Sequence, residues 1–166
     1  MNINYKKPLT EKFIKKNQDE INWDYISQHQ QLNEEFIKEF KDKICWYWIS
    51  SYQKLSEDFI REFQDKVDWT NISQFQKLSE NFIREFQDKV DWDYISKFQK
   101  LSEEFIIEFQ DKIDWDLLLY NYGYNLHIDS NTYIIESDNN DYCSNLISKK
   151  ELINLTLRLI SLKAFQ

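Results

Sequence analysis

A tryptophan that recurs every 23 residues limits the fold of this chain more than any other feature. It stands at Trp23, Trp46, Trp69, Trp92 and Trp115. Alignment on it divides the chain into five repeats without an insertion, at residues 9–31, 32–54, 55–77, 78–100 and 101–123. The repeats share the pattern L-[S/T/N]-E-x-F-I-x-x-x-x-D-x-[V/I]-x-W-x-x-[I/L], in which the tryptophan occupies position 15. A strict period of this length predicts an array of stacked structural units.

Each repeat carries the start signals of two short helices. Position 2 holds residue types that cap a helix N-terminus, and a glutamate follows each of them: Thr10, Asn33, Ser56, Ser79 and Ser102. Position 14, directly before the tryptophan, holds a second set of capping residues: Asn22, Asp68, Asp91 and Asp114. We therefore expect helix A over positions 3–11 and helix B over positions 15–22 of every repeat.

Composition supports helices joined by short connections. The 166 residues include Gly 1 and Pro 1, which leaves little of the turn chemistry that β-rich folds need. Helices of about eight residues are not stable alone in water, so each repeat must stack on its neighbours. The prediction is an all-α fold, a short α-solenoid of five two-helix repeats within residues 1–123.

Residues 124–166 leave the repeat pattern. Gly123 is expected as the C-terminal cap of the last helix B. The segment Tyr124–Glu136 has apolar stretches on both sides of a D-S-N turn, which predicts a small β-hairpin. Ser148 and Glu151 have the spacing of a capping box and predict a helix over the apolar segment that reaches Phe165. We expect 124–166 to cap the array or to join two copies in a homo-oligomer, because an array needs an atypical end unit.

Charge and apolar content exclude several classes of function. The formal net charge is −8 and the estimated pI is 4.8. Lysine and arginine alternate with aspartate and glutamate, so the basic stripe of direct nucleic-acid binding is absent. No apolar stretch approaches the ~18 residues of a membrane helix, and the two cysteines make no disulfide framework. We expect a soluble, intracellular protein of the cytoplasm.

The repeated aspartate and tryptophan allow a ligand-binding and a structural interpretation. A ladder of carboxylates at position 11 could hold cations, but DKVDW has no glycine and too few carboxylates for a calcium loop. We expect this aspartate to end helix A and to bond N–H groups at the corner. The tryptophan could stack a sugar or a base, but Ile72 at +3 and Phe75 at +6 from Trp69 indicate a buried seam. The sequence thus predicts neither a metal nor a cofactor.

One arrangement could support catalysis. His127 and Cys143 are sixteen residues apart, and Asp141 is close to the cysteine. A reactive thiol needs a positive neighbourhood, whereas this cysteine ends the acidic stretch ESDNNDYC. We expect no catalytic residues.

Positions 16, 17 and 20 of helix B vary between repeats and lie on one face of a helix. Aromatic and basic residues there are the candidate partner-binding residues: Tyr25, Tyr47, Trp48, Tyr94 and Lys97. Repeat 2 departs most, because CWYW replaces the capping aspartate by Cys45 and adds two aromatics. Exposed aromatics are typical anchors of protein interfaces. The alternative is drift at solvated positions, with Trp48 filling a gap near repeat 1.

Repeats such as LSEDFIREFQDKVDWTNISQFQK resemble the short L-S-E-x-F-I-x-x-F-x-D-K-V-x-W-x-x-I-S-x-x-Q repeats of uncharacterised proteins in giant DNA viruses, phages and some bacteria. The likeness covers residues 9–123, and repeat 1 departs from it at Asn17 and Glu20. The resemblance implies a viral or mobile-element protein. Such a protein would act in the cytoplasm of the host cell. It supplies no catalytic residues.

These observations favour a non-enzymatic scaffold that binds a protein partner, either a host protein or a second copy of the chain. The alternative is an acidic nucleic-acid mimic that inhibits a host nuclease or DNA-binding protein. Repeat 5 favours the mimic, since six acids against one lysine give it a net charge of −5. Repeats 1–4 weigh against it, because lysine and arginine hold their net charges between 0 and −2.

Overall fold

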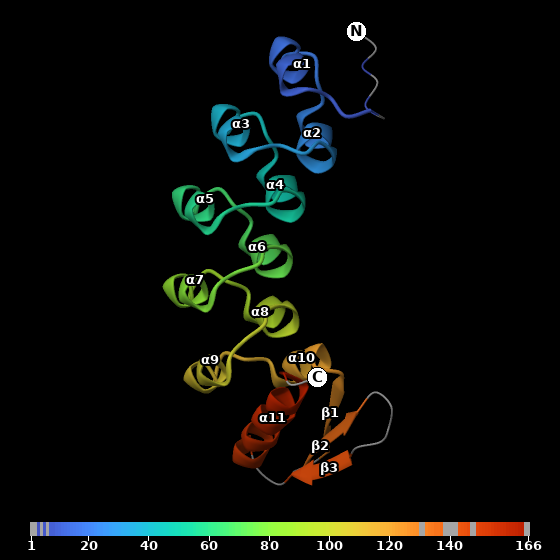
Figure 1. Cartoon of the computed structure of the whole chain (residues 1–166), viewed down its shortest axis with the longest axis vertical. Coiled ribbons are helices and arrows are strands. Elements are labelled where there is room, and N and C mark those ends of the chain that lie inside the picture. The colour runs from blue at the N-terminus through green and yellow to red at the C-terminus, as the bar shows by residue number, and fades with distance from the viewer. Residues whose placement is uncertain are drawn as a thin grey trace. The chain divides into compact units, whose positions relative to one another are not determined.

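A computed structural model of the chain describes residues 3, 5, 7–129, 132–137, 143–146 and 149–164. Within these residues the protein is mostly helical, with eleven helices and three strands (Figure 1). It divides into two compact units, Met1–Val90 and Asp91–Gln166, which we call the N-terminal part and the C-terminal part.

Every repeat forms the two predicted helices. Helix A is α1 (Glu11–Lys16), α3 (Glu34–Glu39), α5 (Glu57–Glu62), α7 (Glu80–Glu85) and α9 (Glu103–Glu108). Helix B is α2 (Trp23–His29), α4 (Trp46–Tyr52), α6 (Trp69–Phe75), α8 (Trp92–Phe98) and α10 (Trp115–Asn121). In the N-terminal part α3, α5 and α7 form one row and α2, α4 and α6 form a second (Figure 1).

The predicted N-caps are confirmed. Each position 2 side chain accepts a hydrogen bond from the backbone N–H three residues later, as Ser56 does from Phe59. Asn22, Asp68, Asp91 and Asp114 do the same for helix B. Helix α4 has no side-chain cap, because Cys45 occupies that place.

Helix A is shorter than predicted, since it ends at position 8 and not at position 11. The residues that follow form a turn in which the Phe63 carbonyl accepts from the N–H groups of Lys66 and Val67. In a continuing helix the Asp68 N–H would donate to the Gln64 carbonyl. Both groups have other partners here. The carbonyl accepts the indole N–H of Trp69, and the amide donates to Ser50 Oγ of the preceding repeat. Trp69 and Ser50 therefore fix the course of the chain after helix A.

The prediction that the position 11 aspartate ends helix A is wrong. Asp19, Asp42 and Asp65 lie beyond the helix on the surface, with side chains 87%, 77% and 91% exposed. Each forms an ion pair with a lysine at position 12 of the next repeat: Lys43 at 3.1 Å, Lys66 at 3.4 Å and Lys89 at 3.3 Å. The residue joins neighbouring repeats instead of closing a helix.

The buried seam at the tryptophan is confirmed in both parts. Trp46 is half-buried, with its ring centroid 6.2 Å from that of Phe59 and 5.1 Å from that of Phe63 in the next repeat. Trp23, Trp69 and Trp92 contact the two phenylalanines of the following repeat in the same way. Side chains from one repeat thus complete the core of another.

Buried polar side chains also link the repeats. Gln53, at position 22, donates from Nε2 to the carbonyls of Ser27 and Gln30 in repeat 1 and accepts the Leu32 N–H at Oε1. Gln76 repeats this arrangement one repeat later, with Ser50, Gln53 and Leu55. These amides satisfy backbone groups at the end of the preceding helix B that a short helix leaves open.

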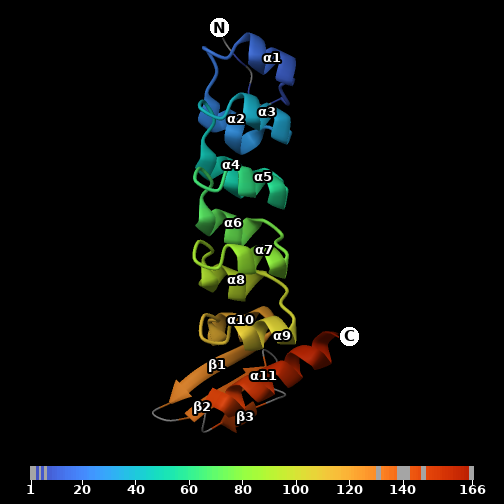
Figure 2. The same ribbon diagram turned by 90° about the vertical axis from the view of Figure 1, so that its left-hand side faces the viewer.

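The C-terminal part ends on an element that differs from the repeats. Strands β1 (Tyr124–Asp129), β2 (Thr132–Ser137) and β3 (Cys143–Leu146) form an antiparallel sheet in the order β1-β2-β3, followed by α11 (Lys149–Ala164). Figure 2 shows the sheet and α11 next to each other. The predicted hairpin and helix are confirmed, while β3 was not expected. The fold is therefore mostly helical rather than all-α. Ser148 and Phe165 lie outside the described residues.

Helix α11 packs on its own chain. Leu152 and Leu159 are buried with Leu119 of α10 and Ile135 of β2, and Trp115 packs against this cluster. The segment therefore covers the face of repeat 5 that a sixth repeat would otherwise cover. This favours the capping interpretation of residues 124–166, and the homo-oligomer stays a prediction.

Candidate functional site

The outer face of helix B carries the candidate partner-binding residues. In α4 the inner positions Ile49, Ser50 and Gln53 are buried, so positions 16, 17, 20 and 21 are left to face outward. Position 16 varies in size and charge, from aspartate and threonine to tyrosine. Except at position 17 of repeat 3, where Asn71 is buried, this face is where one repeat can differ from the next without disturbing the core.

In repeat 2 this face carries three aromatic side chains in contact. The centroid of Trp48 lies 4.7 Å from that of Tyr47 and 5.7 Å from that of Tyr52. Tyr47 and Tyr52 are 51% and 58% exposed, and Trp48 is half-buried between them. We call Tyr47, Trp48 and Tyr52 the repeat 2 aromatic cluster.

Tyr25 instead contacts residues at the N-terminal end of the chain and in its own repeat. Its ring lies 4.8 Å from Tyr5 and 4.2 Å from His29, measured between centroids, and its hydroxyl donates to the Tyr5 carbonyl. The side chain is half-buried. These contacts use the hydroxyl within the chain.

The C-terminal part has a second aromatic group on helix B. Tyr94 stacks on Phe98 at 6.0 Å, and Lys97 Nζ lies 5.4 Å from the Phe98 centroid and 5.7 Å from that of Tyr120. Phe98 and Tyr120 are both exposed. The structure thus joins two candidate residues, Tyr94 and Lys97, and adds Phe98 and Tyr120 to them.

Position 21 is the part of the surface that the sequence prediction missed. Phe75 is 54% exposed and Tyr52 and Phe98 share its exposed position, so the assignment of the +6 aromatic to the buried seam is wrong. Six residues on a helix with 3.6 residues per turn leave two side chains roughly 120° apart. The angle alone separates Phe75 from the face of Trp69, and it was the signal that could have found these residues.

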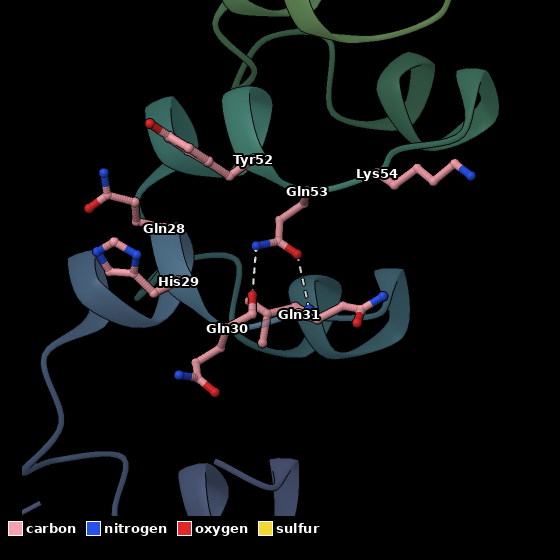
Figure 3. Close-up of a pocket in the computed structure, with 8 residues that line it drawn as sticks. Gln28, His29, Gln30, Gln31, Tyr52, Gln53 and Lys54 are labelled. Carbon is pink, nitrogen blue, oxygen red and sulfur yellow. Dashed lines mark hydrogen bonds between the residues drawn. The ribbon is translucent and has the colours of Figure 1, made fainter. Parts of the chain in front are cut away.

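A cavity of about 400 Å³ opens in the N-terminal part beside Tyr52. Its walls come from the ends of α2 and α4 and include Gln28, His29, Gln30, Tyr52, Gln53 and Lys54 (Figure 3). In Figure 3 Gln53 lies at its centre, with His29 and Tyr52 on one side and Lys54 on the other. The cavity is therefore bordered by amide, imidazole, phenol and ammonium groups.

Most repeated charges of the N-terminal part are paired between repeats. Lys38 contacts Glu62, and Arg61 contacts both Glu85 and Asp58. The hydrogen bond to Glu62 raises the pKa of Lys38, and the one to Glu85 raises the pKa of Arg61. Both cations stay charged over the whole neutral range and link consecutive helices A.

The catalytic arrangement of His127, Asp141 and Cys143 gains no support from the one side chain of the three that the structure describes, His127. His127 is exposed, and its Nε2 lies 3.8 Å from Glu136 Oε2 across the β1–β2 pair. Asp141 and the side chain of Cys143 lie outside the described residues. Where the structure describes the chain, no group of three or more His, Cys, Asp or Glu is placed to hold a metal ion.

Among the described helices none combines the length and apolar character needed to cross a membrane. Comparison of the chain with protein-family models, curated proteins and solved structures gives no match. The resemblance to viral and bacterial repeats thus stays a prediction, and the candidate site rests on its own geometry.

Proposed function

We propose that this protein is a non-enzymatic α-solenoid scaffold that binds a partner protein through the outer face of helix B. The observation that carries this proposal is the exposure of large aromatic side chains on that face. Tyr47, Tyr52 and Phe75 each expose about half of their surface, although the cores of the same repeats are fully packed. Such side chains supply most of the binding energy where proteins meet.

The repeat contacts support the solenoid part of the proposal. Helix α4 packs on both α2 and α6, and the tryptophan and glutamine contacts recur with the same geometry from one repeat to the next. Arrays of this kind hold their cores between neighbours and leave one long surface for a partner. Variation at positions 16 and 17 would then choose the partner.

The paired charges weigh against a nucleic-acid mimic. Glu62, Glu85 and three of the position 11 aspartates each have a cationic neighbour within 4 Å, so their negative charge is largely compensated. A mimic would need uncompensated charge that attracts a basic protein. From the resemblance we further propose a viral or mobile-element origin and a host protein as the partner.

Affinity capture with the full-length chain tests the proposal. We expect Tyr47→Ala with Trp48→Ala to lose partners that the wild type retains. The control is Ile107→Ala, which removes an exposed apolar side chain from α9 instead of helix B. Retention of every partner by the double variant, with its folding intact by circular dichroism, would contradict the proposal.

A salt series separates the scaffold from the mimic. A mimic should lose affinity for its basic partner by a large factor between about 50 and 200 mM salt, and duplex DNA should compete for that partner. A scaffold that binds through aromatic side chains should change little over the same range. Steep salt dependence together with competition by DNA would favour the mimic.

A further inference from the structure

Two glutamine side chains that line the cavity beside Tyr52 are bonded to the backbone. Gln53 uses Nε2 for the Ser27 and Gln30 carbonyls and Oε1 for the Leu32 N–H, and Gln30 accepts from the Leu9 N–H at 2.7 Å. These amides hold the backbone and offer little to a ligand. The other polar side chains that line the cavity are Gln28, His29, Gln31, Tyr52 and Lys54.

The same combination of aromatic and lysine recurs one repeat later. Position 21 holds Tyr52 in repeat 2 and Phe75 in repeat 3, and position 23 holds Lys54 and Lys77. All four side chains are exposed. Because α4 packs on α6, the two pairs lie along one edge of the N-terminal part. We call Tyr52, Lys54, Phe75 and Lys77, with the cavity, the aromatic–lysine edge.

The lysines of this edge differ from the other repeated cations. The lysines and arginines at positions 7 and 12 pair with acids of a neighbouring repeat, as Lys38 does with Glu62 and Lys66 with Asp42. Lys54 and Lys77 form no ion pair with any residue that the structure describes. In a chain of net charge −8, the edge is a place where positive charge remains available to a partner.

The distance expected between equivalent residues of neighbouring helices B is close to one turn of a polyproline II segment. Packed helices lie about 8–10 Å apart, so equivalent residues of neighbouring helices B recur at roughly that distance. A polyproline II segment has three residues per turn and a rise of about 3.1 Å, which brings every third side chain to one face about 9 Å from the last. Aromatic grooves bind such segments without an ordering cost, because the conformation is already formed.

We propose that the aromatic–lysine edge docks a polyproline II segment of the partner protein with an acidic residue at every third position. One carboxylate enters the cavity beside Lys54, the next meets Lys77, and the intervening residues contact Tyr52 and Phe75. The inference rests on the proposed scaffold function and names the chemistry of the segment that the scaffold holds.

The test titrates the full-length, isotopically labelled protein with three 15-residue probes and follows its amide NMR signals. The probes are blocked peptides of Glu-Pro-Pro and Gln-Pro-Pro repeats and the oligonucleotide dT15. We expect the Glu-Pro-Pro peptide to shift the signals of Tyr52, Lys54, Phe75 and Lys77. We expect the Gln-Pro-Pro peptide to bind roughly fivefold or more weakly, because two ammonium–carboxylate pairs are lost.

Charge reversal at the edge provides the matched comparison. Lys54→Glu with Lys77→Glu should weaken the Glu-Pro-Pro peptide roughly tenfold, since it replaces attraction by repulsion. Lys16→Glu with Lys41→Glu makes the same change of net charge at exposed lysines of the helix A to helix B corners and should change the affinity little. Neither pair of lysines is buried, so the fold should survive both changes.

Three results would overturn the inference. They are equal affinity for the glutamate and glutamine peptides, signal shifts outside the edge, and tighter binding of dT15 than of the acidic peptide. The last would assign the edge to single-stranded nucleic acid. Partner capture distinguishes this failure from failure of the scaffold. Lys54→Glu with Lys77→Glu could keep every partner that Tyr47→Ala with Trp48→Ala loses. In that case the proposed scaffold function is supported, and the proposal of an acidic segment at the edge is wrong.

Discussion

At the scale of single residues, both polar side chains and the aromatic seam link the repeats. The position 22 glutamine and the position 19 serine are buried, and each bonds backbone groups of a neighbouring repeat. Ser50, for example, donates to the Trp46 carbonyl and accepts the Asp68 N–H. A buried polar group is stable only when it is paired, so these residues are as constrained as the core.

Gln76→Met tests the glutamine contacts, because methionine keeps the length of the side chain and removes its polar atoms. The Ser50 and Gln53 carbonyls and the Leu55 N–H would lose their partner. We expect the free energy of unfolding in urea to fall by about 1–3 kcal/mol.

The control for that variant is Gln74→Met, at a half-exposed position of the same helix. It should change the free energy of unfolding by less than about 0.5 kcal/mol. Equal losses in the two variants would show that the hydrogen bonds of Gln76 add little.

Tyr122 takes the place of the glutamine in repeat 5 and gives a prediction on pH. Burial raises the pKa of its hydroxyl above the ordinary value of 10.0, while the hydrogen bond from the Leu101 backbone lowers it. Since the pKa is higher in the folded protein, the unfolded chain loses this proton first as the pH rises. The stability from Tyr122 is therefore complete below about pH 10 and falls above it.

Tyr122→Phe removes this titration. We expect the wild type to be more stable than the variant from pH 7 to 9, with a difference that shrinks above about pH 10. Urea unfolding at several pH values measures it. A difference that stays constant to pH 11 would contradict the raised pKa.

At the scale of elements, local signals decide where a helix begins, and contacts with other repeats hold the turn that follows helix A. All five helices A begin on a capping side chain, as do four of the five helices B. The chain after helix A is held by the tryptophan of the same repeat and, in repeats 2, 3 and 5, by the serine of the preceding repeat. The sequence therefore predicts helix starts better than helix ends.

Cys45→Asp should supply the missing cap of α4. The Asp68, Asp91 and Asp114 side chains each accept a backbone N–H at the start of helix B, and a carboxylate there also favours the helix dipole. We expect a gain of about 0.5–2 kcal/mol in the free energy of unfolding.

The reciprocal change, Asp68→Cys, should cost a similar amount. Asp68→Asn serves as the control, because Asn22 shows that an amide oxygen caps the same position. If Cys45→Asp leaves the protein no more stable, the prediction that α4 lacks a stabilising cap is wrong.

At the scale of the whole molecule, the C-terminal part shows how the series of repeats stops. Repeat 5 has Leu119 where the earlier repeats have a serine, and this leucine is fully buried with Ile135, Leu152 and Leu159. A serine hydroxyl is useful only where another repeat offers an N–H group. Its replacement by leucine adapts the last helix B to an apolar neighbour.

Leu119→Ser tests this adaptation. It restores the repeat pattern and places a hydroxyl in the apolar cluster, which should cost about 2–4 kcal/mol. Hydrogen exchange of the full-length protein should show faster exchange in β1, β2 and α11, with little change in α3 to α6.

Leu117→Ser is the matched control, because Leu117 is half-buried on the same helix. We expect it to change exchange in the sheet and α11 much less than Leu119→Ser does. Similar effects of the two variants would mean that the cluster does not hold the sheet and α11 in place.

The sequence by itself determined the period, the two helices of each repeat, their starts and the hairpin with its following helix. These features depend on residues close together in the chain, such as Ser56 with the Phe59 N–H, and short-range bonds leave a regular pattern. The tertiary structure alone decided the course of the chain after helix A, the surface position of Asp42 and the third strand. The first two depend on groups of a neighbouring repeat, such as Lys66 for Asp42, and spacing within one repeat does not specify those groups. The third strand depends on its pairing with β2 outside the repeats.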